Sequence, residues 1–137
     1  MENILRYEIG HERFVVSHPS VADIKSCIDQ MDNDIRTGFT LELPSGILAL
    51  AGGNRDRVVV GFNGRRREKS FRWGRLVDPQ CIGSNEEIAI SAEGEINHEP
   101  LYLTVSKETA FQVASFFLGH DAFPEELTWD GNMNKSD

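Results

Sequence analysis

The chain contains 137 residues, of which 39% are hydrophobic and 26% are charged. This length and composition are typical of one folded domain, and they exclude a collagen-like, proline-rich or wholly disordered chain. The 22 acidic residues outnumber the 14 basic ones, and the resulting net charge of −8 disfavours a broadly basic nucleic-acid binder.

The amino-terminal part of the chain predicts a strand followed by a helix. The strand is predicted within residues 7–16, where a run of aromatic and β-branched side chains precedes Pro19. Ser20 is a typical helix N-cap, and Asp23 three residues later gives a near capping box. Apolar residues then recur at three- and four-residue intervals, which predicts a helix over residues 21–35. They are Val21, Ile24, Ile28, Met31 and Ile35.

The middle of the chain predicts a series of short strands separated by turns. The strand-like runs are residues 39–43, 47–51, 58–62, 71–77, 87–92 and 101–105. Asn63-Gly64 is the strongest hairpin signal among the turns. Phe71 and Trp73 share one face of their run, and we expect this face to lie in the core. Residues 93–100, between the last two runs, are polar and acidic.

A second helix is predicted to begin after the N-cap Ser106 and to end at Gly119, with a wide apolar stripe that buries most of it. Residues 127–129 predict a final short strand. Residues 1–130 should therefore form one α+β domain, with residues 131–137 as a frayed polar tail. We expect a curved antiparallel sheet of about six strands with two helices packed on one face, because helices and strands do not alternate along the chain.

The sequence shows no pattern typical of a catalytic or metal site. The two His-Glu pairs, at His11 and His98, lack the second histidine that a zinc-binding helix needs. Cys27 lies on the apolar face of the first predicted helix, where a cysteine behaves as a small hydrophobic residue. Cys81 lies in a loop-like segment. We therefore expect no catalytic residue, no metal and no cofactor.

We also expect no secretion signal and no membrane span. No apolar run approaches the length of a membrane span, and the first ten residues lack a basic leader followed by an apolar stretch. Two cysteines are too few for a disulfide framework. We expect a cytoplasmic protein with no membrane partner.

Charge is distributed unevenly along the chain. Residues 55–75 have a net charge of +6, whereas residues 76–137 have a net charge of −10. One interpretation is that the basic segment is a solvated hairpin whose arginines pair with neighbouring carboxylates. The other is that the acidic half forms a contact surface for a basic partner, since complementary charge speeds encounter and rejects wrong partners.

The end of the chain resembles family one of the immunity proteins of bacterial polymorphic-toxin systems. The similar residues are Ala110, Ala114, Phe117, Gly119, Pro124, Leu127 and Trp129. Proteins of that family end in an Ala-rich helix with a late aromatic residue, a Gly, a Pro, and a short strand that closes on Trp. The order of the preceding elements is also similar. In this sequence, four residues (120–123) separate Gly119 from Pro124, a longer link than the family often has.

The resemblance implies a cytoplasmic antitoxin that binds and blocks a cognate toxin domain, often one that acts on nucleic acid, such as a deaminase or nuclease. Acidic residues would steer a basic toxin, and an aromatic side chain would anchor it. The candidate steering residues are Glu86, Glu87, Glu93, Glu95 and Glu99, and the candidate anchors are Tyr102 and Phe123. The alternative interpretation is that the glutamates are ordinary solvated charges and that the two aromatic residues belong to the core.

Two other functions stay open from the sequence. The first is a small ligand-binding or enzymatic α+β domain with a pocket under the sheet. The second is an RNA-binding accessory protein that uses the basic hairpin at Arg65-Arg66-Arg67-Glu68-Lys69, although the net negative charge disfavours nucleic acid as a partner.

Overall fold

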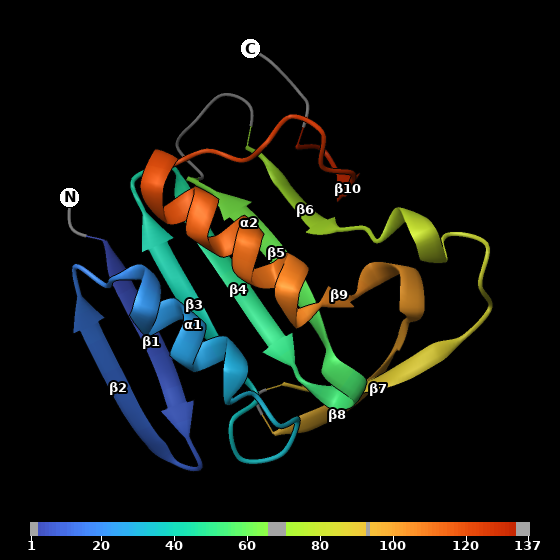
Figure 1. Ribbon diagram of the computed structural model, residues 1–137, viewed down its shortest axis with the longest axis horizontal. Helices are drawn as coiled ribbons and strands as arrows, with labels where there is room; N and C mark the ends of the chain where they lie inside the picture. The colour runs from blue at the N-terminus through green and yellow to red at the C-terminus, as the bar shows by residue number, and fades with distance from the viewer. Residues whose placement is uncertain (1–2, 66–70, 93, 134–137) are drawn as a thin grey trace.

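The computed structural model describes residues 3–65, 71–92 and 94–133. Within these residues, an open antiparallel sheet of eight strands carries two helices on one face, which confirms the α+β class (Figure 1). The sheet has more strands than the six expected. Its strand order is β10-β6-β5-β4-β3-β1-β2, with β9 also paired to β5. The strands are β1 (Ile4–Ile9), β2 (Glu12–Ser17), β3 (Gly38–Leu43), β4 (Gly46–Gly52), β5 (Arg57–Gly64), β6 (Trp73–Leu76), β9 (Val105–Ser106) and β10 (Trp129–Gly131).

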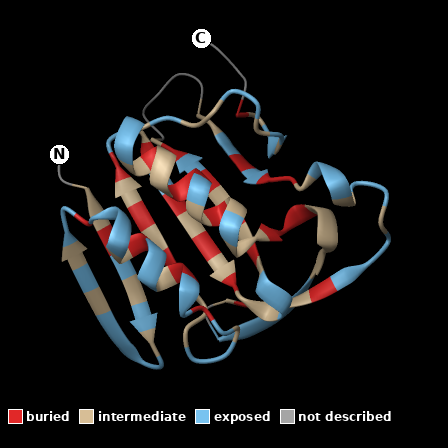
Figure 2. Ribbon diagram, viewed as in Figure 1, coloured by how far each residue is buried: buried red, intermediate tan, exposed pale blue. Residues whose placement is uncertain are grey.

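The core lies between this sheet and the helices α1 (Val21–Asp29) and α2 (Lys107–His120). Strand register explains which face is apolar: Leu41 of β3 pairs with Leu5 of β1 and with Leu48 of β4, so their side chains share the face under the helices. All three leucines are fully buried, and Figure 2 shows the same buried band along β3, β4 and β5. Neither helix in the described part of the chain has the length and hydrophobicity needed to cross a lipid bilayer.

The first helix is shorter than predicted, ending at Asp29 instead of residue 35. Its N-terminus follows the prediction, since Ser20 and Asp23 form a reciprocal capping box. The early end has a local cause. The Asp32 carboxylate accepts hydrogen bonds from three successive N–H groups, which stabilises a turn that competes with the helix. The residue that follows, Asn33, has a positive φ of 64° and cannot continue a right-handed helix.

A second, two-stranded sheet forms where only one strand was predicted. β7 (Glu87–Ala92) matches its predicted range, and β8 (Glu95–Pro100) pairs with it in the segment that had no strand prediction. The strand predicted over residues 101–105 is wrong: the chain forms a 3₁₀ turn, η3 (Leu101–Leu103), before the short β9. Thr104 stabilises this turn, because its N–H and hydroxyl both donate to the Leu101 carbonyl.

Two further predictions need correction. Trp73 is 48% exposed, because Gly74 and Leu76 take the core-facing positions of β6. Gly74 contacts the neighbouring β10 segment so closely that a side chain at this position would clash with Met133 and Asp130. The second helix begins after Ser106 as predicted but ends beyond Gly119, with Asp121 in the left-handed cap position. The Asp121 carboxylate also accepts a hydrogen bond from the Ser45 N–H.

Candidate functional site

The β7–β8 hairpin gathers four of the five candidate steering glutamates. Glu86 directly precedes β7, Glu87 begins it, and Glu95 and Glu99 lie on β8. Glu93 lies outside the described residues. Figure 1 shows that this hairpin crosses the end of the molecule near the start of β5. Residues 95–98 of β8 are all exposed, and Ile96 has 67% of its surface open to solvent.

Two asparagines attach the hairpin to the body of the protein. The Asn33 side chain accepts a hydrogen bond from the Ser91 N–H at 2.8 Å, and the Asn54 side chain donates to the Ala89 carbonyl at 2.9 Å. Both contacts satisfy main-chain groups of β7 that β8 does not use. They leave the outer edge of β8 free, since β8 pairs only with β7 in the part of the chain that the structure describes.

The hairpin glutamates differ in how far they are already paired. Glu86 forms an ion pair with Arg55 at 2.9 Å, and Glu99 forms one with Arg75 at 2.6 Å. The Glu99 side chain is only 15% exposed, so it holds β8 against β6 and is poorly placed to meet a partner. Glu87 and Glu95 are exposed and form no ion pair within residues 3–65, 71–92 and 94–133. Among the hairpin glutamates that the structure describes, these two carboxylates are therefore the ones free to act on another molecule.

Arginines of the basic segment mostly pair with carboxylates, as one interpretation of the sequence had it. Four of its described arginines are in ion pairs: Arg55, Arg57, Arg65 and Arg75. Three of their partners, Asp78, Glu86 and Glu99, come from the acidic half of the chain. Residues 66–70 lie outside the described residues, so the hairpin proposed for RNA binding is described only at Arg65. The side chain of Arg65 donates to the carbonyl groups of Leu43 and Pro44.

Arg57 is the centre of a polar network that the sequence did not reveal. Its guanidinium binds the Asp78 carboxylate at 2.9 Å, the Thr104 hydroxyl at 3.0 Å and the Thr104 carbonyl at 2.6 Å. Burial favours the neutral form of Asp78, but hydrogen bonds from Arg57 and from the Gln80 N–H outweigh it and lower the pKa of this carboxyl group. The network ties residues 78–104 to the start of β5.

The two candidate anchors lie in different settings. Phe123 belongs to an aromatic cluster: its ring stacks on Phe117 at 4.7 Å and meets Phe62 and Trp129 edge-on at 5.0 Å. This packing agrees with a role in the core, the alternative that the sequence left open. Tyr102 lies in η3, where it is half-buried and its carbonyl accepts a hydrogen bond from the Asp78 N–H.

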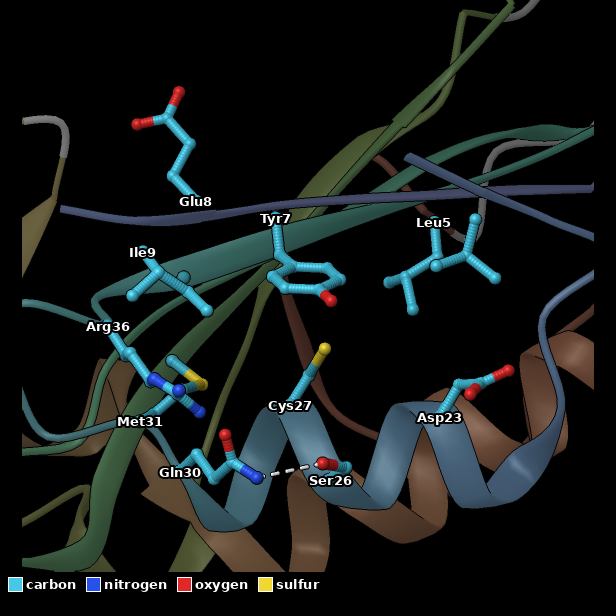
Figure 3. A pocket seen from close by; sticks show the side chains of 12 residues that line it. Leu5, Tyr7, Glu8, Ile9, Asp23, Ser26, Cys27, Gln30, Met31 and Arg36 are labelled. Atoms are coloured by element: carbon cyan, nitrogen blue, oxygen red, sulfur yellow. Dashed lines mark hydrogen bonds between the residues drawn. The ribbon is translucent and has the colours of Figure 1, made fainter. Parts of the chain in front are cut away.

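A pocket of about 300 Å³ opens between α1 and β1 (Figure 3). Leu5, Ile9, Val16 and Met31 supply apolar lining, and the sulfur of Cys27 points towards the Tyr7 ring. Burial, reinforced by the nearby Asp23 carboxylate, raises the pKa of the Cys27 thiol to about 11. The thiol is therefore neutral near pH 7 and is a poor nucleophile, which agrees with the small hydrophobic role predicted for it.

A wider groove of about 620 Å³ lies on the sheet face away from the helices. Its floor consists of small side chains, among them Thr40, Ala49 and Ala51, and Ala92 at the end of β7 forms part of its wall. The charged groups along it are in ion pairs: Arg6 binds Glu42 at 2.7 Å, and Arg13 binds Glu8 at 3.2 Å. This groove therefore has a concave surface but few charged groups that are free of an ion pair.

The structure brings together groups that lie far apart in the sequence. The hydrogen bond from Arg57 to Thr104 joins residues 47 positions apart, and the one between Asn33 and Ser91 joins residues 58 positions apart. No local sequence motif marks either Arg57 or Asn33. Within the described residues, no three side chains of the metal-ligating types lie close enough to hold an ion.

Comparison with known proteins assigns no family to the chain. No protein-family model matches it, and no curated protein matches it at a significant level.

Proposed function

We propose that this protein is a cytoplasmic immunity protein that binds a basic toxin domain and covers the surface with which that toxin holds its nucleic-acid substrate. A deaminase or nuclease fits this role, since such an enzyme needs positive charge to bind phosphates. A carboxylate-bearing inhibitor can occupy the same positive surface in place of the phosphates. Inhibition is stoichiometric and requires no reaction by the inhibitor itself.

The β7–β8 hairpin has the features that support this proposal most directly. It forms a sheet separate from the main one, its outer strand is exposed, and Glu87 and Glu95 on it have no ion-pair partner among the described residues. Exposed carboxylates at the rim of an interface mainly raise the association rate and reject partners of like charge. The neighbouring Ile96 adds an exposed apolar side chain for direct contact.

The similarity at the end of the chain supports the proposal independently. Ala110, Ala114 and Phe117 are fully buried on the face of α2 that packs on the sheet, and Trp129 lies in β10, which pairs with β6. These residues build the fold, so they carry the family resemblance without taking part in binding.

The test begins with the toxin domain encoded next to the gene for this protein. We expect the two purified proteins to form a one-to-one complex and the complex to lack the toxin's activity on nucleic acid. The double variant Glu87→Lys and Glu95→Lys should slow association by about tenfold or more at low salt and reduce the dependence of the association rate on salt.

Glu12→Lys is the matched control, because Glu12 is an exposed glutamate on β2, within the main sheet rather than the hairpin. It changes the charge by the same amount per site and should leave the association rate nearly unchanged. Equal effects of the hairpin and control variants would remove the hairpin from the interface. Failure of every neighbouring gene product to bind or be inhibited would overturn the proposed function.

A further inference from the structure

The polar side chains that line the pocket between α1 and β1 differ in whether they already have a hydrogen-bond or ion-pair partner. Two carboxylates line it, and both are already engaged: Asp23 accepts hydrogen bonds from the N–H and hydroxyl of Ser20, and Glu8 pairs with Arg13 at 3.2 Å. Gln30, also on the rim, donates its side-chain amide to the Ser26 hydroxyl at 3.0 Å (Figure 3).

Arg36 is the exception on this rim. It is partly buried, and within the described residues its guanidinium forms no hydrogen bond or ion pair, although the group lies close enough to influence the Cys27 thiol. Figure 3 places Arg36 near Ile9, Gln30 and Met31 at one end of the pocket. A guanidinium offers five N–H donors in a planar fork that matches a carboxylate, so the pocket presents an unused anion-binding group beside an apolar wall.

We propose that this pocket binds a small molecule that combines a compact apolar body with one carboxylate. The apolar body lies against Leu5, Val16 and the Tyr7 ring, and the carboxylate receives two hydrogen bonds from Arg36. The volume of about 300 Å³ is at the lower end of the range for small-molecule sites, which limits the body to about the size of one aromatic ring.

The charge of the rim also decides between anions. The carboxylates of Asp23 and Glu8 lie around the same opening, so a second negative charge on the ligand is repelled. A singly charged carboxylate therefore fits better than a doubly charged phosphate ester. The neutral Cys27 thiol contributes an apolar contact, and no covalent step is involved.

The site is separate from the surface proposed to bind a toxin. None of the residues that line the pocket belongs to β7 or β8. The pocket proposal and the toxin proposal can therefore fail independently, and the experiment below needs no toxin.

Three probes of similar size test the proposal: phenylacetate, its uncharged analogue phenylacetamide, and phenyl phosphate. Each is titrated into the ¹⁵N-labelled protein while the amide resonances of α1 and β1 are followed. We expect phenylacetate to shift these resonances with a Kd of about 1 mM or below and to bind about tenfold more tightly than either other probe. Equal binding of phenylacetate and phenylacetamide, or no shift at 10 mM phenylacetate, would overturn the proposal.

A variant tests the role of the guanidinium. Arg36→Gln should weaken phenylacetate binding about tenfold and leave phenylacetamide binding unchanged. Arg36→Lys should retain part of the preference for phenylacetate over phenylacetamide. Arg72→Gln is the matched control, because it removes the same charge from a residue that does not line the pocket. An unchanged Kd in Arg36→Gln, with resonance dispersion that shows it to be folded, contradicts the proposal.

Cys27 provides a second readout in a Cys81→Ser background. Saturating phenylacetate should slow alkylation of Cys27 by iodoacetamide at least threefold, since the ligand covers the thiol. Phenylacetamide at the same concentration should protect less. Alkylation at the same rate with and without phenylacetate would place its binding elsewhere and overturn the proposal.

Discussion

Asn33 binds Ser91 as a neighbouring β-strand would. The Oδ1 atom of Asn33 accepts a hydrogen bond from the Ser91 N–H at 2.8 Å, and its Nδ2 atom lies 3.4 Å from the Ala89 carbonyl oxygen. The backbone of Asn33 has a φ of 64°, a conformation that asparagine tolerates better than most residues, and its own N–H donates to the Gly52 carbonyl. One residue therefore joins the end of β4 to the inner edge of the β7–β8 hairpin.

Asn33→Ala should lower the free energy of unfolding by about 2 kcal/mol. It leaves the partly buried Ser91 N–H without its acceptor and places a residue with a stronger preference for negative φ in a left-handed conformation. Chemical denaturation measures the change in stability, and hydrogen exchange of the Ser91 amide measures the local effect. Asn97→Ala on the exposed face of β8 is the control and should change stability by less than about 0.5 kcal/mol.

Asn33→Gly separates the two causes. Glycine accepts the positive φ but supplies no acceptor, so this variant should keep fast exchange at Ser91 while regaining part of the stability lost in Asn33→Ala. Slow exchange at Ser91 in both variants would show that the side-chain hydrogen bond is unimportant in solution.

The Arg57 network should make stability depend on pH in the acidic range. Because the pKa of Asp78 is lower in the folded protein than the unfolded value of about 3.9, its contribution is present above about pH 4 and is lost as the pH falls through the folded pKa. Asp78→Asn should therefore destabilise the protein at pH 7, and the difference from the wild type should shrink towards pH 2. Urea denaturation at a series of pH values measures this difference in the free energy of unfolding.

Arg57→Met tests the same network from the other partner. It should cost about 2–3 kcal/mol at pH 7, because it removes the guanidinium that donates to the partly buried Asp78 carboxylate and to the Thr104 carbonyl. Arg55→Met is the matched control: its ion pair with Glu86 is exposed, and its loss should cost less than about 1 kcal/mol. Similar losses in the two variants would contradict a special role for Arg57.

Cys27 should react slowly with alkylating reagents. A thiol with a pKa of about 11 contains roughly a hundredfold less thiolate at pH 7.5 than one with a pKa near 9, and partial burial slows access further. In Cys81→Ser, the rate of reaction with iodoacetamide should rise about tenfold per pH unit between pH 7 and 9. A rate at pH 7 that matches a free cysteine peptide would be inconsistent with the observed burial of the sulfur.

Local signals could be predicted from the sequence because their partners are a few residues away. The N-caps Ser20 and Ser106 both formed, each with its hydrogen bond to the residue three positions later. Features that depend on distant partners could not be predicted. Apart from Ile96 and Pro100, β8 consists of polar residues, so it shows no regular alternation of apolar and polar side chains, and it becomes a strand through its pairing with β7.

The same limit applies to the candidate site. Sequence placed a group of glutamates in one segment, and the structure assembles four of them on or beside one hairpin. It could not show that Glu86 and Glu99 are paired with Arg55 and Arg75, because these partners lie 31 and 24 positions away. Nor could alternation in β6 decide which face is buried, since Trp73 on one face and Leu76 on the other are both strongly apolar.

Phe123 offers a direct test of whether an aromatic residue near the end of the chain supports the fold or binds a partner. Its ring contacts Phe117, Phe62 and Trp129, so Phe123→Ala should cost about 2–3 kcal/mol of stability by leaving a cavity in this cluster. Phe123→Leu keeps most of the volume and should cost about 1 kcal/mol. Trp73→Ala, which removes an aromatic ring that is 48% exposed, should cost less than Phe123→Ala and serves as the control. Thermal unfolding measures all three variants. If Phe123→Ala unfolds at the wild-type temperature but fails to bind a toxin, the ring is a partner anchor instead of part of the core.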